Sequence, residues 1–156
     1  RIPFINLEPT AVAAVGRLQG YRQALEEAGI AFDPALIRNT YGNAADGYTQ
    51  ALALLAAGAP PTAILCGNDA VAAGVYEAIK ERGLHIPQDM AVISFDNLEM
   101  IATMLKPALS TMALPHLEMG EWAVRHLLQS SMHASTRSDP VAQVRLPCPY
   151  IERESV

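Results

Sequence analysis

Short apolar runs alternate along this sequence with longer segments whose apolar residues recur at helical spacing. The apolar runs lie at residues 2–6, 36–40, 63–67 and 91–95, and the helical segments lie at residues 16–28, 44–57 and 70–82. Strands that are apolar throughout and separated by amphipathic helices are typical of a parallel sheet buried on both faces, with right-handed crossovers. We therefore predict an α/β fold with a Rossmann-like parallel sheet and helices on both of its faces.

The third helical segment carries signals for its start and its end. Asn68 or Asp69 can cap its first turn, and Gly83 follows its last turn. After Pro107 the repeat stops, and the remaining chain is not another strand and helix pair. There we predict an extended segment at residues 109–114, a helix at about 116–129, an exposed polar loop at 130–139 and a last strand at 144–151.

The charge and composition of the 156 residues exclude several classes of protein. A net charge of −5, a pI near 5.3 and two lysines, Lys80 and Lys106, do not suit a surface that neutralises DNA phosphates. No apolar stretch reaches the roughly 20 residues that span a bilayer, so we predict no membrane contact. Cys66 and Cys148 form no CxxC pair or cysteine–histidine cluster, which fits a reducing cytoplasm.

Sequence motifs for catalysis and for metal binding are missing. There is no GxGxxG after the first apolar run, no GxxxxGK[ST], no GxSxG and no HExxH. The four histidines, His85, His116, His126 and His133, lack the spacing of metal ligands. We predict that the chain is not an enzyme and uses no metal ion or cofactor.

Polar residues follow the predicted strands, at the edge where open parallel sheets bind ligands. These strand tips are residues 8–10, Tyr41-Gly42, Asn68-Asp69 and Asp96-Asn97. Their carboxylates and amides suit sugar hydroxyls or purine edges, and Arg17 could add its five N–H donors. Asn68 and Asp69 could equally do no more than cap a helix, and Arg17 taken alone could be solvated. For Asp96 we favour a role in binding, so a cleft for a small polar molecule is predicted.

Four segments share their order and spacing with one protein family. In chain order they are GRLQGYRQALEEAGI, PTAILCGNDAVAAGVYEAIKERGLHIPQDMAVISFDN, PALSTM and IERESV. They resemble the lactose-repressor family of bacterial transcription regulators, in which PQDMAVISFDN followed by PALST is typical. The resemblance implies one part of a two-lobed, periplasmic-binding-protein-like core, with an effector between the lobes and a DNA-binding head that these residues do not include.

The same resemblance implies what the residues do. Arg17, Asn68 and Asp96 match effector-binding positions of the family, and Tyr41 lies one residue before a position that often stacks on the effector. The effector would be a sugar or a nucleoside-like metabolite. The protein would be a cytoplasmic homodimer that meets operator DNA only through its head. The implied dimer interface, which we expect to be exposed, comprises Ala73, Tyr76, Met100, Ile101 and Met104.

The family's two-lobed plan also implies how the chain is divided. Residues 1–108 would form the C-terminal lobe, residues 109–140 would cross to the N-terminal lobe, and residues 141–156 would return as a strand. A helix in the crossing segment would then lack its host lobe. An isolated chain should either recruit a second copy to bury that helix or leave it poorly ordered. Its apolar stripe comprises Leu117, Val124, Leu127 and Leu128.

Three features depart from the family pattern. Gly42 stands where relatives often have an aromatic residue, Leu114 stands where many have glutamine, and the predicted loop at residues 11–14 is apolar rather than polar. These differences favour a less polar effector or a looser pocket. The alternative interpretation is a lobe of a periplasmic sugar-binding protein, which has the same fold and would carry a secretory signal upstream.

Overall fold

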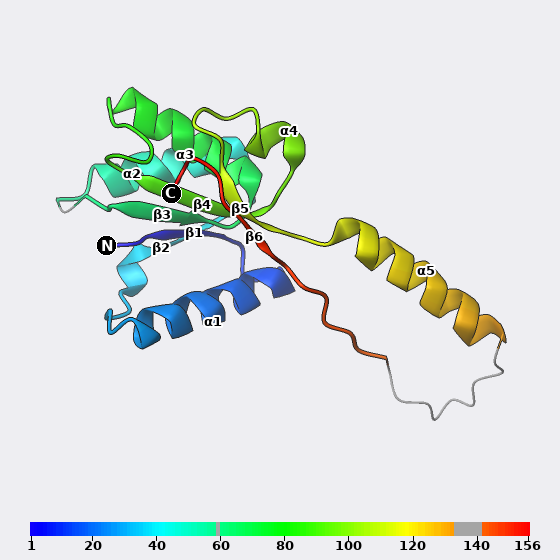
Figure 1. Ribbon diagram of the computed structural model, residues 1–156. Helices are drawn as coiled ribbons and strands as arrows, with labels where there is room; N and C mark the ends of the chain where they lie inside the picture. The colour runs from blue at the N-terminus through cyan, green and yellow to red at the C-terminus, as the bar shows by residue number, and fades with distance from the viewer. Residues whose placement is uncertain (59, 133–141) are drawn as a thin grey trace.

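A six-stranded sheet with the order β2-β1-β3-β4-β5-β6 forms the centre of the molecule (Figure 1). The computed structural model describes residues 1–58, 60–132 and 142–156. The strands are β1 (Phe4–Leu7), β2 (Ile37–Thr40), β3 (Ala63–Cys66), β4 (Ala91–Asp96), β5 (Ser110–Ala113) and β6 (Tyr150–Ile151). β1 to β5 are parallel, and β6 is antiparallel to β5. The predicted α/β class and parallel sheet are confirmed.

Four of the five helices in the described residues lie where the sequence predicts a helix, and the short helix at residues 99–102 was not predicted. The helices are α1 (Val12–Glu27), α2 (Ala44–Leu55), α3 (Asp69–Glu81), α4 (Glu99–Ala102) and α5 (His116–Met132), with a 3-10 turn at Pro34–Leu36. Asn43 and Asn68 cap α2 and α3, because each side-chain oxygen accepts a hydrogen bond from a backbone N–H of the first turn. Of the two predicted caps of α3, Asn68 is therefore the cap.

The start of α1 differs from the sequence prediction. Residues 11–14 were predicted as a loop, but α1 begins at Val12 with Ala11 at its N-cap position. The apolar period becomes visible only from Leu18, whereas the alanines before it favour helix without any period. The side-chain amide of Asn6 at the end of β1 donates to the carbonyl oxygen of Ala14 at 3.0 Å, which ties this first turn to the sheet.

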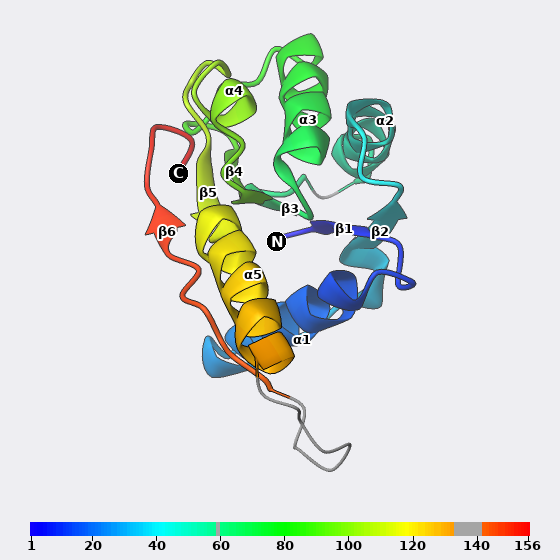
Figure 2. The same cartoon turned by 90° about the vertical axis from the view of Figure 1, so that its right-hand side faces the viewer.

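The larger core lies between the sheet and the layer that contains α2, α3 and α4 (Figures 1 and 2). α2 and α3 cross at two glycines. A Cβ atom on Gly74 would lie 1.8 Å from the Ala44 carbonyl oxygen, and one on Gly47 would lie 2.3 Å from that of Val71. The two helices are thus in backbone contact. The core comprises Ile5, Ile64, Val71, Val75, Tyr76, Ile79 and Val92, among others.

The opposite face of the sheet is covered less completely. α1 packs over β1 through a smaller cluster of Phe4, Tyr21 and Leu25. Beside α1, a cavity of about 710 Å³ exposes Leu65, Ile93 and other apolar side chains of the sheet. Helices lie on both faces, as predicted, but within the described residues α1 alone covers this one.

α5 projects away from the sheet, and its apolar stripe is exposed (Figures 1 and 2). The predicted last strand at 144–151 is wrong in length, because β6 contains only Tyr150 and Ile151. Ahead of it, one further hydrogen bond joins the Ala113 N–H to the Pro149 carbonyl oxygen at 2.8 Å. The predicted loop at 130–139 and His133 fall largely or wholly on residues 133–141, outside the described residues.

Candidate functional site

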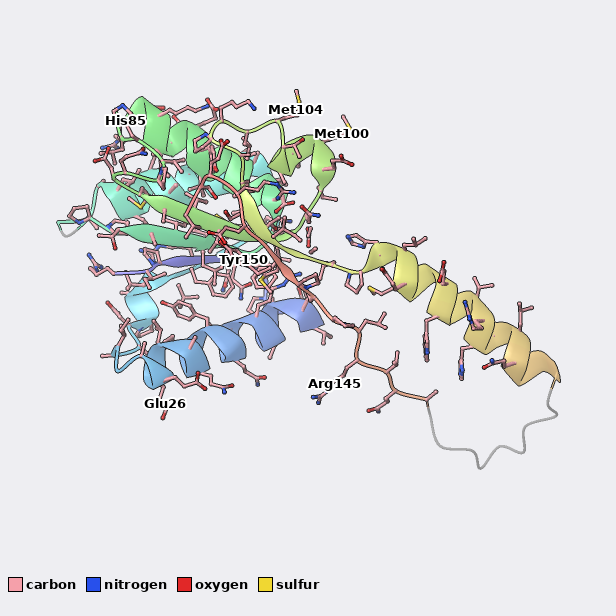
Figure 3. All side chains as sticks on the ribbon, in the orientation of Figure 1. Glu26, His85, Met100, Met104, Arg145 and Tyr150 are labelled. Atoms are coloured by element: carbon pink, nitrogen blue, oxygen red, sulfur yellow. The ribbon has the colours of Figure 1, made fainter. Side chains whose placement is uncertain are left out.

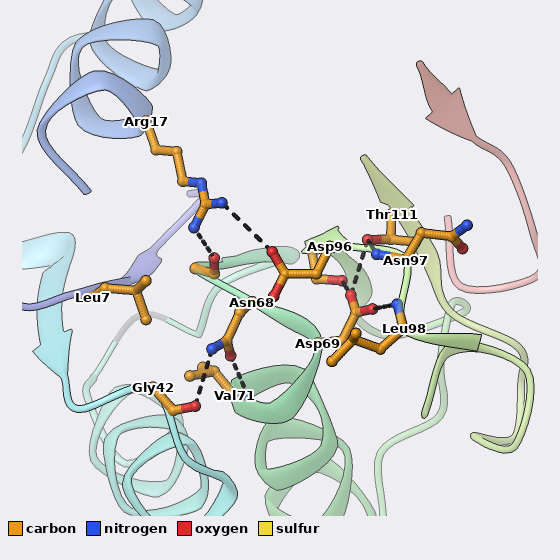
Figure 4. Close-up of polar contacts among 12 residues, drawn as sticks. Leu7, Arg17, Gly42, Asn68, Asp69, Val71, Asp96, Asn97, Leu98 and Thr111 are labelled. Atoms are coloured by element: carbon orange, nitrogen blue, oxygen red, sulfur yellow. Dashed lines mark hydrogen bonds and ion pairs between the residues drawn. The ribbon is translucent and has the colours of Figure 1, made fainter. Parts of the chain in front are cut away.

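Three of the predicted site residues meet at the carboxyl edge of the sheet (Figure 4). Arg17 extends from the second turn of α1, Asn68 lies between β3 and α3, and Asp96 ends β4. β3 and β4 are neighbours in a parallel sheet, so their carboxyl ends lie side by side, and α1 lies across the edge from them. The chain order therefore brings together residues that are far apart in the sequence.

Arg17 is held in one orientation by three contacts. Its Nη1 donates to the Gly67 carbonyl oxygen at 2.7 Å, and its Nη2 lies 3.6 Å from Asp96 Oδ1. The guanidinium also lies over the Phe95 ring, 4.5 Å from the ring centroid. With 12% of its side chain exposed, Arg17 is not the solvated helix-start residue of the alternative interpretation.

Asp96 is partly buried and lies in an unusual turn. Its φ angle is +111° and that of Asn97 is +56°. Non-glycine residues in such conformations cost on the order of 1–3 kcal/mol each, so the surrounding structure must hold this turn. Burial raises the pKa of Asp96 above its usual range, while the positive charge of Arg17 opposes the shift.

Asn68 is largely occupied by structural hydrogen bonds. Its Oδ1 accepts from the Val71 N–H at 2.8 Å, and its Nδ2 donates to the Gly42 carbonyl oxygen at 3.0 Å. At most one N–H of the amide is left for a ligand. Gly42 itself has φ +85°, and a Cβ there would lie 3.1 Å from the Asn68 amide nitrogen. Its lack of a side chain lets the β2 loop approach Asn68 closely.

Tyr41 does not join the other three residues. Its side chain is 86% exposed, and its backbone N–H is bound by the carboxylate of Asp46. Two important polar residues were not predicted as site residues. Asp69, which the sequence left open as a strand-tip contact or a helix cap, is fully buried, and Arg153 donates to the side chain of Asn97 at 2.7 Å. A carboxylate at a strand tip was a usable signal for Asp69, but nothing local marks Arg153.

Comparison with known proteins identifies the family to which the chain belongs. The periplasmic binding protein-like domain family matches residues 1–156. The ribose operon repressor of Haemophilus influenzae is 42% identical over 116 residues, covering 74% of this chain and 35% of the repressor. The CytR repressor of Escherichia coli is 38% identical over 112 residues, 72% of this chain and 33% of its own. The chain belongs to the lactose-repressor family, as part of its effector-binding core.

Solved structures of the lactose-repressor family share the whole fold. The regulator CelR in complex with cellobiose superposes with a TM-score of 0.91 at 28% identity, over 100% of this chain and 46% of CelR. The Lac repressor bound to ONPG superposes with a TM-score of 0.86 at 28% identity, over 100% of this chain and 45% of the repressor. The chain thus spans between a third and a half of these relatives. They are named as repressors or regulators, not enzymes.

The positions predicted for the dimer interface are only partly exposed. Met100 and Met104 point away from the molecule, with 86% and 73% of their surface exposed (Figure 3), and Ala73 and Ile101 are half-buried. The expectation that Tyr76 is exposed is wrong, because its side chain is fully buried. At its position on α3 the side chain faces the sheet, and it joins the core cluster.

The helices of the described residues were compared with the requirements for crossing a membrane. In the ranges 1–58, 60–132 and 142–156, no helix combines the length and the apolar character needed to cross a bilayer.

Proposed function

We propose that this chain is the effector-sensing and dimerising part of a cytoplasmic transcription repressor. The observation that carries the proposal is the ion pair of Arg17 with Asp96 at the carboxyl edge of the sheet. An effector bound here and in a second lobe would favour one lobe arrangement, and its differential affinity for the two arrangements would set the response. Operator DNA would be bound by a separate DNA-binding domain, because the net charge of −5 on this chain does not suit contacts with DNA phosphates.

The chemistry of the edge favours a neutral hydroxyl-rich effector, a sugar or a nucleoside-like metabolite. The Asp96 carboxylate accepts hydrogen bonds, and Arg17 donates them, so adjacent hydroxyls could bridge the two. Leu114 and Gly42 offer no side-chain hydrogen bonds, which limits the polar contacts from this lobe. Because one relative is a ribose operon repressor and another structure holds cellobiose, D-ribose and cellobiose are the first probes.

We also propose that the chain is divided at residue 108. Residues 1–108 would be the C-terminal lobe, residues 109–140 would cross into a second lobe, and residues 141–156 would return. The exposed stripe on α5 supports this division, because Leu117, Val124 and Leu127 are each more than half exposed. The share of CelR that this chain covers, 46%, leaves room for such a lobe.

The test is an effector titration with the full-length protein by calorimetry. Asp96→Ala should weaken binding of the active sugar by roughly 1–3 kcal/mol, because donors on the ligand or on Arg17 lose their acceptor. Arg17→Ala should also weaken it, whereas Arg22→Ala on the same helix should not, since Arg22 lies over Phe32 away from this edge. Unchanged affinity in Asp96→Ala would contradict the assignment. Binding of operator DNA would separate a repressor from the alternative, a periplasmic carrier.

A further inference from the structure

The carboxylate of Asp69 is fully buried and does not belong to the ion pair at the edge of the sheet. It accepts hydrogen bonds from three other parts of the chain (Figure 4). The hydroxyl of Ser94 on β4 donates to it, the hydroxyl of Thr111 on β5 donates at 2.9 Å, and the Leu98 N–H donates at 2.6 Å. A buried carboxylate needs such donors, and these are charge-assisted bonds.

The same network reaches Asn97. The Asn97 N–H donates to Thr111 Oγ1 at 3.3 Å. Thr111 gives its single hydroxyl proton to Asp69, so its oxygen is left as an acceptor for Asn97. The two peptide N–H groups that follow Asp96 are therefore both connected to Asp69. The Leu98 N–H bonds to its carboxylate directly, and the Asn97 N–H bonds to Thr111, which in turn donates to that carboxylate.

These bonds act on the turn that the effector site depends on. Asp96 and Asn97 both have positive φ angles, and neither is glycine. A side chain at such a turn takes its direction from the backbone, so the turn determines whether the Asp96 carboxylate faces Arg17. On the other side of the turn, Arg153 donates to the Asn97 side chain at 2.7 Å and to the Leu109 carbonyl oxygen at 2.7 Å.

Leu98 is also the N-cap residue of the next helix, α4. Its carbonyl oxygen accepts from the Ile101 and Ala102 N–H groups, both at 2.8 Å, and its side chain makes no cap. α4 carries Met100, which is exposed on the surface. Two residues, Asn97 and Leu98, thus separate Asp96 from α4, and the N–H of the second is bound by Asp69.

We infer that Asp69 is a positioning residue, which holds the turn at 96–98 so that Asp96 faces Arg17 and α4 starts at a fixed place. The assignment of Asp96 as an effector contact rests on the proposed function. The positioning of the turn at 96–98 by Asp69 does not depend on that function. Displacement of the turn by an effector would strain the Leu98 bond first and move α4 with it. Asp69 is therefore the link between the effector edge and the surface of α4.

Two variants test this in the full-length protein. Thr111→Val keeps the shape but removes the hydroxyl, and Asp69→Asn leaves one donor without an acceptor. Hydrogen exchange resolved to single amides should be about tenfold faster at Asn97 and Leu98, with protection of α3 and β4 retained. The affinity for D-ribose or cellobiose should fall in parallel. Thr111→Ser, which restores the hydroxyl, and Asp46→Asn, a first-turn aspartate on α2, should both match the wild type.

Two results would overturn the inference. One is protection at Asn97 and Leu98 within about twofold of the wild type in both variants. The other is a uniform loss of protection through β4, β5 and α3 in Thr111→Val, which would assign the network to general folding. The two proposals can fail separately. If the wild type binds neither sugar, the proposed effector class is wrong. If hydrogen exchange at Asn97 and Leu98 is still faster in the two variants, the positioning role of Asp69 is supported all the same.

Discussion

At the scale of single residues, Asp96 combines two properties that make pH a useful probe. Burial raises the pKa of its carboxyl group, with the charge of Arg17 opposing the shift; Asp69 raises it further and His116 lowers it. An effector that donates hydrogen bonds binds the ionised carboxylate more tightly than the protonated one, because charge-assisted bonds are stronger and protonation takes up part of the acceptor capacity. The raised pKa therefore makes Asp96 lose its charge at a higher pH than an exposed aspartate.

We expect effector affinity to fall as the pH is lowered through the pKa of Asp96, by at most about tenfold per unit. The stability of the free protein should respond with the opposite sign. A folded-state pKa above the unfolded value means that the folded state binds the proton more tightly. Ionisation of Asp96 therefore lowers the free energy of unfolding at neutral pH. Protonation at low pH restores this free energy. Calorimetric titrations at several pH values would measure the first effect, and urea unfolding of the wild type against Asp96→Asn the second. A wild-type affinity that is as flat with pH as that of Asp96→Asn would contradict the role of the carboxylate.

At the scale of elements, the crossing of α2 and α3 depends on glycine. Gly74 and Gly47 let the two helix backbones touch, and the cap of α3, Asn68, also holds the β2 loop through Gly42. The crossing therefore sets where α3 begins, and with it the positions of Asn68 and Asp69 at the site.

Gly74→Ala should destabilise the fold by about 3 kcal/mol or prevent folding, because the new Cβ would lie 1.8 Å from a backbone oxygen and the helices must separate. The matched control is Gly20→Ala in α1, where a Cβ meets nothing within 4 Å. That variant should be stabilised by about 0.5–1 kcal/mol, since alanine restricts the unfolded chain and favours helix. Urea unfolding of both variants decides this, and equal stabilities would contradict the close crossing.

At the scale of the whole molecule, the described residues leave apolar surface exposed at α4, along the stripe on α5 and in the cavity beside α1. The α4 surface is the one that the proposed dimer uses, and it lies next to a groove of about 500 Å³ between α2 and α3 that includes Ala73. Exposed methionines so close together favour association with another copy.

The double variant Met100→Lys/Met104→Lys should shift the full-length protein from dimer to monomer, because two charges would have to be buried in the interface. Sedimentation velocity across a concentration series measures this. Met100→Leu/Met104→Leu keeps the surface apolar and should remain dimeric. A dimer as tight in the lysine variant as in the wild type would place the interface elsewhere.

The sequence predicted best those features that depend on neighbouring residues, and it predicted worst those that depend on residues far apart in the chain. β1 to β5 and α2, α3 and α5 follow from local periodicity and end signals, so their prediction succeeded to within a few residues. Tyr76 was expected to be exposed because the family resemblance places it in the dimer interface, but its side chain lies in the core with Val75 and Ile79. The start of α1 was missed because its alanines carry no period, and β6 is short because residues 142–149 have almost no strand partner.

The sequence alone determined the class of fold, the family and the identities of Arg17, Asn68 and Asp96, because periodicity and motif spacing are properties of neighbouring residues. The tertiary structure decided what those residues do for one another. It showed that Asn68 is mostly a cap, that Arg17 is held by Gly67 and Phe95, and that Asp69 accepts a hydrogen bond from the Leu98 N–H in the turn after Asp96. Hydrogen bonds between β3, β4 and β5 join residues tens of positions apart, and burial exists only once the layers have packed.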